Sequence, residues 1–250
     1  LILSGTQYGL PVSDAVNAGA VAALKEKGVS VNDIYVESLD IVRAPDAHRR
    51  AVLASLLKDK LATKNVALVI AANQWGLDFL AREGNELAPP DTPVVATFIT
   101  TAAVPWQGTP RPILDLSDRA DVAGTIRYGL DLFPRTRRLV TVFGADDRQA
   151  PTSVQVADAL AALPGRLEVE NTAALSHDEM LQRVAALPAD SLVLLGTYFR
   201  DRTGRSFIPA EVAAEIAAKL VARHPYVFTD AKVPADVLGS WERRKRVEKA

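Results

Sequence analysis

Short aliphatic runs alternate along this chain with longer segments in which apolar residues recur every three or four positions. Uninterrupted runs of β-branched and aliphatic residues are typical of strands buried on both faces of a sheet, and the longer period is typical of amphipathic helices. Strands that are separated by crossover helices pair in parallel. The pattern therefore predicts an α/β fold in which helices flank parallel sheets.

The first half of the chain contains a full set of such elements. Its predicted strands span residues 1–5, 31–36, 66–71 and 94–99. Between them, apolar residues at i, i+4 spacing predict two helices, with stripes of Val16, Ala20 and Leu24 and of Leu53, Leu57 and Leu61. These elements make up the greater part of a first predicted lobe.

A stretch rich in proline and glycine, residues 104–112, disfavours both a helix and a central strand and marks a boundary between two lobes. The same alternation resumes after it. Predicted strands span residues 139–143, 167–170 and 191–198, and predicted helices lie near residues 118–133, 152–163, 177–187 and 209–223. A capping box of Ser176 and Glu179, and Pro209 in a first helical turn, support two of these helices.

The predicted lobes are not contiguous in the sequence. The first lobe is predicted to contain residues 1–103 and 230–250, and the second lobe residues 104–229. A last apolar run at residues 226–230 predicts a strand that returns the chain to the first lobe. We therefore expect the crossings between the lobes near residues 102–116 and 228–233.

Polar and aromatic side chains follow several of the predicted strands directly. The carboxyl ends of parallel strands, with the loops that follow them, are where α/β folds bind ligands. Two successive sheets of this kind would place such loops around a shared cleft. The ligand-binding residues predicted on this ground are Gln7, Tyr8, Asn73, Gln74, Thr100, Thr101, Asp146, Tyr198, Phe199 and Asp201.

Some of these residues have an ordinary structural explanation as well. Tyr198 and Phe199 are suited to stacking on a ligand, but two core aromatics would give the same sequence. Asp146 with Asp147 is suited to binding, but a polar surface loop explains the pair equally well. Trp75 beside Asn73 and Gln74 suits an aromatic or neutral polar ligand, or packing against a helix. The sequence leaves these alternatives open.

Charge and composition exclude several classes of function. The chain has 29 Lys and Arg against 30 Asp and Glu, a net charge of -1, so no positive field attracts nucleic acid. It has no cysteine, which excludes disulfides, thiolate metal sites and a cysteine nucleophile. Its apolar runs are far shorter than the roughly 20 residues that span a bilayer.

The motifs that carry catalysis or bind cofactors are absent. No two glycines bracket a single residue, so the dinucleotide fingerprint is missing, and no phosphate-binding loop is present. His48, His177 and His224 are isolated in the sequence and are predicted to be surface or capping residues. We therefore expect no cofactor, no metal ion and no catalytic residue. The weaker alternative is an enzyme with Asp146, Asp147 or Asp201 as acid or base.

Four short segments carry a family resemblance. They are YGLP at residues 8–11, YVESLDIVR at 35–43, LFPRTRR at 132–138 and FRDRTGRSFIP at 199–209. Together they resemble the ABC-transporter substrate-binding-like family, and the first resembles the branch that forms extracytoplasmic sensor regions of bacterial histidine kinases. The resemblance implies a two-lobe type I periplasmic-binding-protein-like fold that closes on a small molecule, with Asp230 as a further ligand-binding residue at the hinge.

The sequence and this resemblance predict an extracytoplasmic sensor domain of a signal-transduction protein, such as the histidine kinase of a two-component system. The domain itself is not expected to be an enzyme. Its expected partners are a small molecule in the inter-lobe cleft and a membrane-spanning signalling or permease protein; a homodimer is left open, and nucleic acid is not expected. Because the chain opens on a strand without an initiator Met, we expect a fragment. The resemblance implies that it is a periplasmic part of a membrane-anchored protein. The alternative is the solute-binding protein of an ABC transporter.

Overall fold

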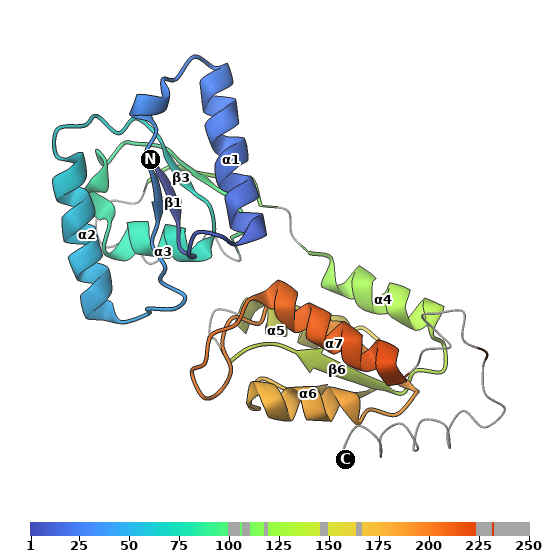
Figure 1. The fold of residues 1–250 in the computed structure, drawn as a ribbon. Coiled ribbons are helices and arrows are strands. Elements are labelled where there is room, and N and C mark those ends of the chain that lie inside the picture. Colours follow the sequence, from blue (N-terminus) through green and yellow to red (C-terminus); the bar gives the residue numbers. More distant parts are fainter. Residues whose placement is uncertain are drawn as a thin grey trace. The chain divides into compact units, whose positions relative to one another are not determined.

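The chain divides into two compact units, Leu1–Ala120 and Asp121–Ala250, and each is described by itself. The computed structural model describes residues 1–99, 106, 111–117, 120–145, 150–163, 167–223 and 232. Within these ranges each unit contains a parallel sheet and its own helices (Figure 1).

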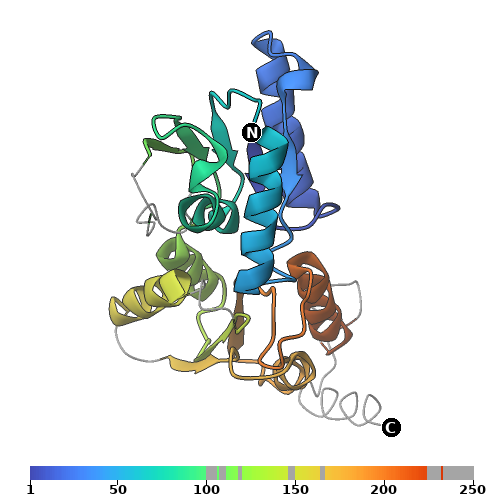
Figure 2. The ribbon, with the colours of Figure 1, turned by 90° about the vertical axis from the view of Figure 1, so that its left-hand side faces the viewer.

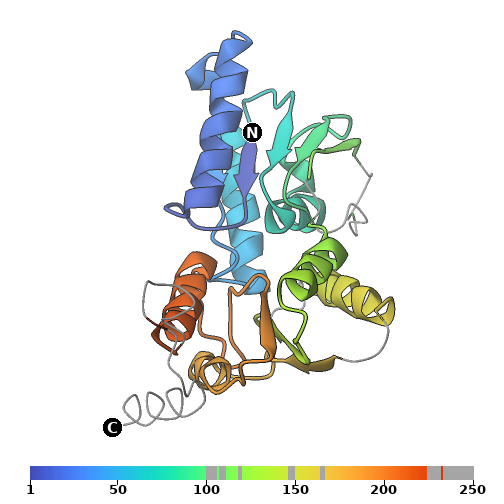
Figure 3. The ribbon, with the colours of Figure 1, turned by 90° about the vertical axis from the view of Figure 1, so that its right-hand side faces the viewer.

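The first unit is built on a five-stranded parallel sheet with the strand order β2-β1-β3-β4-β5. The strands are β1 Ile2–Ser4, β2 Val36–Ser38, β3 Val69–Ala71, β4 Val94–Ala96 and β5 Ile113–Asp115. Its helices are α1 Pro11–Glu26, α2 Ala47–Leu61 and α3 Gln74–Arg82, with short 3₁₀ turns η1 Val31–Asp33 and η2 Asn85–Leu87. Helices α1 and α2 lie on opposite sides of β1 (Figures 1, 2 and 3).

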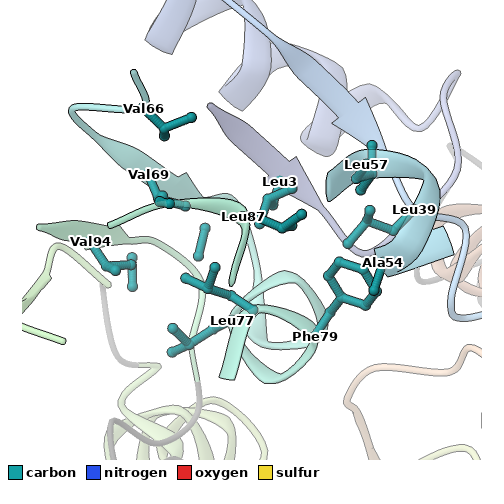
Figure 4. Close-up of a cluster of buried hydrophobic side chains, with 14 of the residues drawn as sticks. Leu3, Leu39, Ala54, Leu57, Val66, Val69, Leu77, Phe79, Leu87 and Val94 are labelled. Atoms are coloured by element: carbon teal, nitrogen blue, oxygen red, sulfur yellow. The ribbon is translucent and has the colours of Figure 1, made fainter. Parts of the chain in front are cut away.

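The core of the first unit lies between the sheet and helices α2 and α3. Leu3, Val69 and Val94 come from three neighbouring strands and pack in one cluster with Leu57 of α2 and Phe79 of α3 (Figure 4). Side chains alternate between the two faces of a strand, so these residues share one face of the sheet. This cluster therefore lies on the side of the sheet that α2 and α3 cover.

The second unit contains a three-stranded parallel sheet with the strand order β7-β6-β8. Its elements are α4 Val122–Leu132, β6 Arg138–Val142, α5 Ala150–Ala161, β7 Glu168–Asn171, α6 His177–Ala185, β8 Ser191–Leu195 and α7 Pro209–Arg223. Leu139 packs with residues of α4 and α5, whereas Val140 and Val142 pack with residues of α6 and α7. The central strand β6 is thus buried on both faces, as its uninterrupted apolar run predicts.

Side-chain caps begin four of the described helices, α2, α3, α4 and α6. Asp46 and Asp121 accept hydrogen bonds from backbone N–H groups in the first turns of α2 and α4. The predicted capping box of Ser176 and Glu179 is present at α6. Each cap satisfies backbone donors that a helix leaves unpaired at its first turn.

Some local predictions differ from the structure, and helix α3 Gln74–Arg82 was not predicted at all. Residues 31–36 do not form one strand: Val31–Asp33 is a 3₁₀ turn, and the strand is Val36–Ser38. Ser30 accepts a hydrogen bond from the N–H of Asn32, so a local side-chain bond begins a turn where the apolar pattern predicts a strand. In addition, the short strand Ile113–Asp115, which the sequence pattern missed, pairs with Val94–Ala96.

The predicted limits of the lobes, 1–103 with 230–250 and 104–229, stay a prediction. Most of the first predicted crossing and nearly all of the second lie outside the described residues, as does the predicted strand at 226–230. The strand Ile113–Asp115 belongs to the sheet of the first unit.

Candidate functional site

The carboxyl ends of the parallel strands in the first unit lie along one edge of its sheet. Ser4 pairs with Ser38, Leu3 with Ala71, and Ala71 with Ala96, so β1, β2, β3 and β4 end at nearly the same level. The residues that follow these strands, among them Thr6, Asn73 and Phe98, therefore share this edge. We call the residues that directly follow β1 to β5 in the first unit the carboxyl edge.

Asn73 connects the end of β1 to the start of α3. Its Oδ1 accepts hydrogen bonds from the backbone N–H groups of Gly5 and Gly76, both at 3.0 Å, and its Nδ2 donates to Ser4 Oγ at 3.4 Å. The side chain is buried. The predicted ligand residue Asn73 thus acts as the N-cap of α3 and fixes the loop after β1.

A chain of hydroxyl groups extends this connection to α1. Ser4 Oγ lies 3.0 Å from Thr6 Oγ1, which lies 2.8 Å from Ser13 Oγ in the first turn of α1. Ser4 and Thr6 are buried. Because hydroxyl groups both donate and accept, these three hydroxyls can satisfy one another's hydrogen bonds without any charged group.

Glycine at positions 5 and 76 permits the close contact between these segments. A Cβ on Gly5 would overlap the Cβ of Trp75 and lie 2.8 Å from Asn73 Oδ1. A Cβ on Gly76 would lie 2.5 Å from the carbonyl oxygen of Leu3. The backbone at the end of β1 and the first turn of α3 therefore touch directly, which makes this part of the carboxyl edge rigid.

The other predicted residues after β1 and β3 differ in accessibility. Tyr8 is 83% exposed, and Gln7 is partly buried. Gln74 is buried and donates through Nε2 to Asp78 Oδ1 at 2.8 Å. Of these three side chains, Tyr8 is the one that stands open to a ligand.

Phe98 is a residue at the carboxyl edge that the sequence prediction missed. It lies two residues after β4, its ring is 55% exposed, and its φ of 51° is in the left-handed region. A bulky non-glycine residue rarely adopts this region, and doing so costs roughly 1–3 kcal/mol. Beside it, the hydroxyl of Thr97 is buried and has no hydrogen-bond partner among the described residues. The sequence offered one signal for this position: the apolar run predicted as a strand at residues 94–99 continues beyond the strand Val94–Ala96.

In the second unit, Tyr198 lies in the core. It is 1% exposed and packs in one cluster with Met180, Val184 and Val212. Burial, with smaller contributions from the nearby charges of Asp201 and Asp178, raises the pKa of Tyr198 to about 12. The ligand role predicted for Tyr198 stays a prediction, and its position is that of a packing residue.

Asp201 organises the loop that follows β8. Its Oδ1 accepts hydrogen bonds from the N–H groups of Thr203 and Arg205 and from the Thr203 hydroxyl at 2.6–3.1 Å. Its Oδ2 accepts from the N–H of His177, the first residue of α6, at 3.0 Å. Burial raises the pKa of Asp201, but these hydrogen bonds together outweigh it, so the pKa lies below its ordinary value.

An aromatic cluster packs against this loop. The His177 ring stacks on Phe207 with 4.2 Å between ring centroids, and Tyr198 meets His177 edge-on at 5.8 Å. His177 Nε2 lies 2.8 Å from Glu215 Oε2 of α7. His177 is therefore a buried residue at the first position of α6, capped by Asp201, and not a surface residue. Phe199 is partly buried, and its carbonyl accepts from the N–H of Phe207.

The remaining predicted site residues, Thr100, Thr101, Asp146 and Asp230, lie outside the described residues, as does Asp147. Within the described ranges, no group of three or more His, Asp or Glu side chains is arranged to hold a metal ion. No helix in the same ranges is long and apolar enough to span a bilayer. The described part of the site is thus a set of amides, hydroxyls and exposed aromatic rings on the first unit.

Two solved structures are similar to this chain in fold. One is the crystal structure of an ABC domain in complex with L-Trp from Streptococcus pneumoniae, with a TM-score of 0.56 and 17% identity over 87% of this chain and 69% of that chain. The other is the crystal structure of a conserved domain protein from Vibrio cholerae, with a TM-score of 0.58 and 14% identity over the same shares. No protein-family model and no curated protein matches the chain.

At such identities the likeness concerns the fold alone. It confirms the predicted α/β architecture of the periplasmic-binding kind, with a parallel sheet flanked by helices in each lobe. The resemblance of the four sequence segments to the substrate-binding-like family stays a prediction.

Proposed function

We propose that this chain is a small-molecule-binding domain that serves as the extracytoplasmic sensor of a signal-transduction protein such as a histidine kinase. The observation that carries the binding proposal is the carboxyl edge of the first unit, where Tyr8 and Phe98 present exposed rings and hydrogen bonds to Asn73 hold the backbone after β1. Ligand sites in α/β proteins lie at this edge and combine apolar or aromatic walls with a few fixed polar groups. The likeness to a structure that holds L-Trp supports the same proposal.

The environment of Asp201 favours binding over the catalytic alternative. Of the three carboxylates considered from the sequence as acid or base, Asp201 lies within the described residues. It accepts hydrogen bonds from three backbone N–H groups and one hydroxyl, and its lowered pKa keeps it charged. A general acid at neutral pH needs a raised pKa instead. Asp201 is therefore suited to holding a loop.

The sensor role rests on the sequence resemblance, and delivery to an ABC permease is its alternative. The similarity in fold to an ABC domain is compatible with this alternative. The two roles differ in what the domain is attached to. Membrane-spanning helices on both sides of the domain in the full-length protein would support the sensor, and a secretory or lipoprotein leader alone would support transport.

The binding proposal is tested with Tyr8→Ala, because Tyr8 is 83% exposed and its truncation leaves the fold intact. Melting temperatures of the wild-type chain are first measured against L-amino acids, sugars, nucleosides and small carboxylates, beginning with L-Trp. We expect at least one compound to raise the melting temperature by mass action. Calorimetry with that compound should show at least about tenfold weaker binding by Tyr8→Ala, which corresponds to about 1.4 kcal/mol.

Tyr128→Ala is the matched control, since Tyr128 is 67% exposed on α4 of the second unit. It should bind the compound as the wild type does. The proposal fails if none of the compounds shifts the melting temperature, or if the two variants bind equally well.

A further inference from the structure

The strained backbone of the first unit is concentrated at its carboxyl edge. Among the described residues, Asp40 and Phe98 are the non-glycine residues with positive φ, at 52° and 51°. Asp40 lies two residues after β2, and Phe98 lies two residues after β4. Strained backbone of this kind persists only where the surrounding structure enforces it, and it collects at ligand-binding segments.

Asp40 has a local reason for its conformation. Aspartate tolerates the left-handed region better than most residues do. Its carboxylate also accepts hydrogen bonds from Arg43 Nε at 2.7 Å and from Arg43 Nη2 at 2.6 Å. The turn after β2 is therefore explained by contacts within the turn itself.

Phe98 has no comparable local reason. Phenylalanine has no side-chain group that could bond to its own backbone, and its ring is 55% exposed, so burial does not offset the strain fully. The neighbouring backbone is nevertheless held firmly, because the N–H of Ile99 donates to Ser117 Oγ at 2.9 Å. The result is an apolar ring held outward at the edge where the first unit would meet a ligand.

The side chains along this edge indicate which chemistry such a ligand has. The described residues that directly follow the strands are mostly uncharged, and the carboxylate of Asp40 is paired with Arg43. Tyr8 provides a second exposed ring, and the buried hydroxyl of Thr97 has no partner among the described residues. The two exposed rings and the scarcity of free charges therefore match an uncharged ring better than they match an anion.

We propose that Phe98 is a specificity-determining residue that stacks on the ligand, and that the ligand is a small molecule with an aromatic ring. The proposal rests on the proposed function, because it assigns a ligand class to the same site. Aromatic pairs gain attraction beyond the area they bury, so the site should distinguish a flat aromatic ring from a saturated ring of similar size.

The test compares matched probe pairs by calorimetry on the 250-residue chain: phenol with cyclohexanol, benzoate with cyclohexanecarboxylate, and L-phenylalanine with β-cyclohexyl-L-alanine. Indole is added as a larger aromatic probe. We expect at least one aromatic probe to bind, and to bind at least about tenfold more tightly than its saturated partner. Binding of every saturated probe as tight as that of its aromatic partner, or no binding of any aromatic probe, overturns the proposal.

Phe98→Asn is the decisive variant, because asparagine accepts the left-handed region but offers no ring. It should bind the best aromatic probe at least about tenfold more weakly while its melting temperature stays equal to or above that of the wild type. Phe133→Asn is the control: Phe133 is also about half exposed, at 53%, but has an ordinary negative φ in the second unit. It should leave the affinity unchanged.

The failures of the two proposals are distinguishable. If a saturated or sugar probe binds, and Tyr8→Ala abolishes that binding while Phe98→Asn does not, the binding function stands and the aromatic ligand class is wrong. A clear fall in the melting temperature of Phe98→Asn without ligand would also overturn the role of Phe98, because it would show that the ring stabilises the fold.

Discussion

The segments that follow the strands differ between the two units. In the first unit, amides and hydroxyls hold the backbone while Tyr8 and Phe98 remain exposed. In the second unit, the loop after β8 buries its tyrosine and uses the carboxylate of Asp201 to bind its own backbone. A position after a parallel strand therefore does not by itself make a binding residue. The same place in the fold can hold an exposed side chain or a packing one, and the helices around it decide which.

The largest expected effect concerns Tyr198. Because this side chain is 1% exposed and packs in the core of the second unit, Tyr198→Ala should lower the free energy of unfolding by about 3–5 kcal/mol. Urea unfolding followed by circular dichroism measures this loss. The exposed Tyr128 is again the control, and its truncation should change stability by no more than about 0.5 kcal/mol. A small loss of unfolding free energy for Tyr198→Ala would mean that Tyr198 is not a core residue, and the contrast between the two units would fail.

Asp201 should have the next largest effect, and a dependence on pH. Asp201→Asn exchanges a charged acceptor for a neutral one and should cost about 1.5–3 kcal/mol at pH 7. The pKa of Asp201 is lowered in the folded protein, so its contribution is present above the ordinary value of 3.8 and is lost as the pH falls through the lower folded value. The free energy of unfolding of the wild type, measured in urea between pH 7 and pH 2.5, should fall at the acid end.

Comparing the pH dependence of Asp201→Asn with that of the wild type separates the contribution of Asp201 from that of the other carboxylates. Asp201→Asn should show a flatter dependence than the wild type below pH 4, because one titrating group has been removed. Parallel curves for the two proteins would mean that the loop after β8 does not depend on an ionised Asp201.

A smaller effect should come from the glycines of the first unit. Gly5→Ala places a methyl group against Trp75 and Asn73 and should destabilise the protein by about 1–3 kcal/mol. Gly19→Ala is the matched control in the middle of α1, where an added Cβ meets nothing within 4 Å. It should stabilise the protein by about 0.5–1 kcal/mol, because alanine favours a helix interior over glycine. Thermal melts of both variants check this contrast, and equal shifts would contradict the rigid contact at the carboxyl edge.

Sequence reasoning led to the carboxyl edge of the first unit, but it did not show which side chains after the strands are exposed. The rule that ligands bind after parallel strands led to Tyr8 and Asn73, and both lie at the carboxyl edge. The same rule selected Tyr198, which is buried, and passed over Phe98, which is exposed. One tyrosine after a strand cannot be told from another in the sequence, because burial depends on the helices that pack around it. A left-handed φ at a phenylalanine is also invisible there, since no residue preference indicates it.

What the sequence determined by itself is the set of elements whose causes are local. The apolar periods, Pro209 and the capping box of Ser176 with Glu179 predicted every described α-helix except α3, and most strands, because these signals act within a few residues of one another. The tertiary structure alone decided that Val31–Asp33 is a turn, that Ile113–Asp115 is a strand, that Asp201 caps α6, and that Phe98 is exposed. Each of these outcomes depends on groups that lie far apart in the sequence or on competition between a local hydrogen bond and a sheet, and no short pattern records that competition.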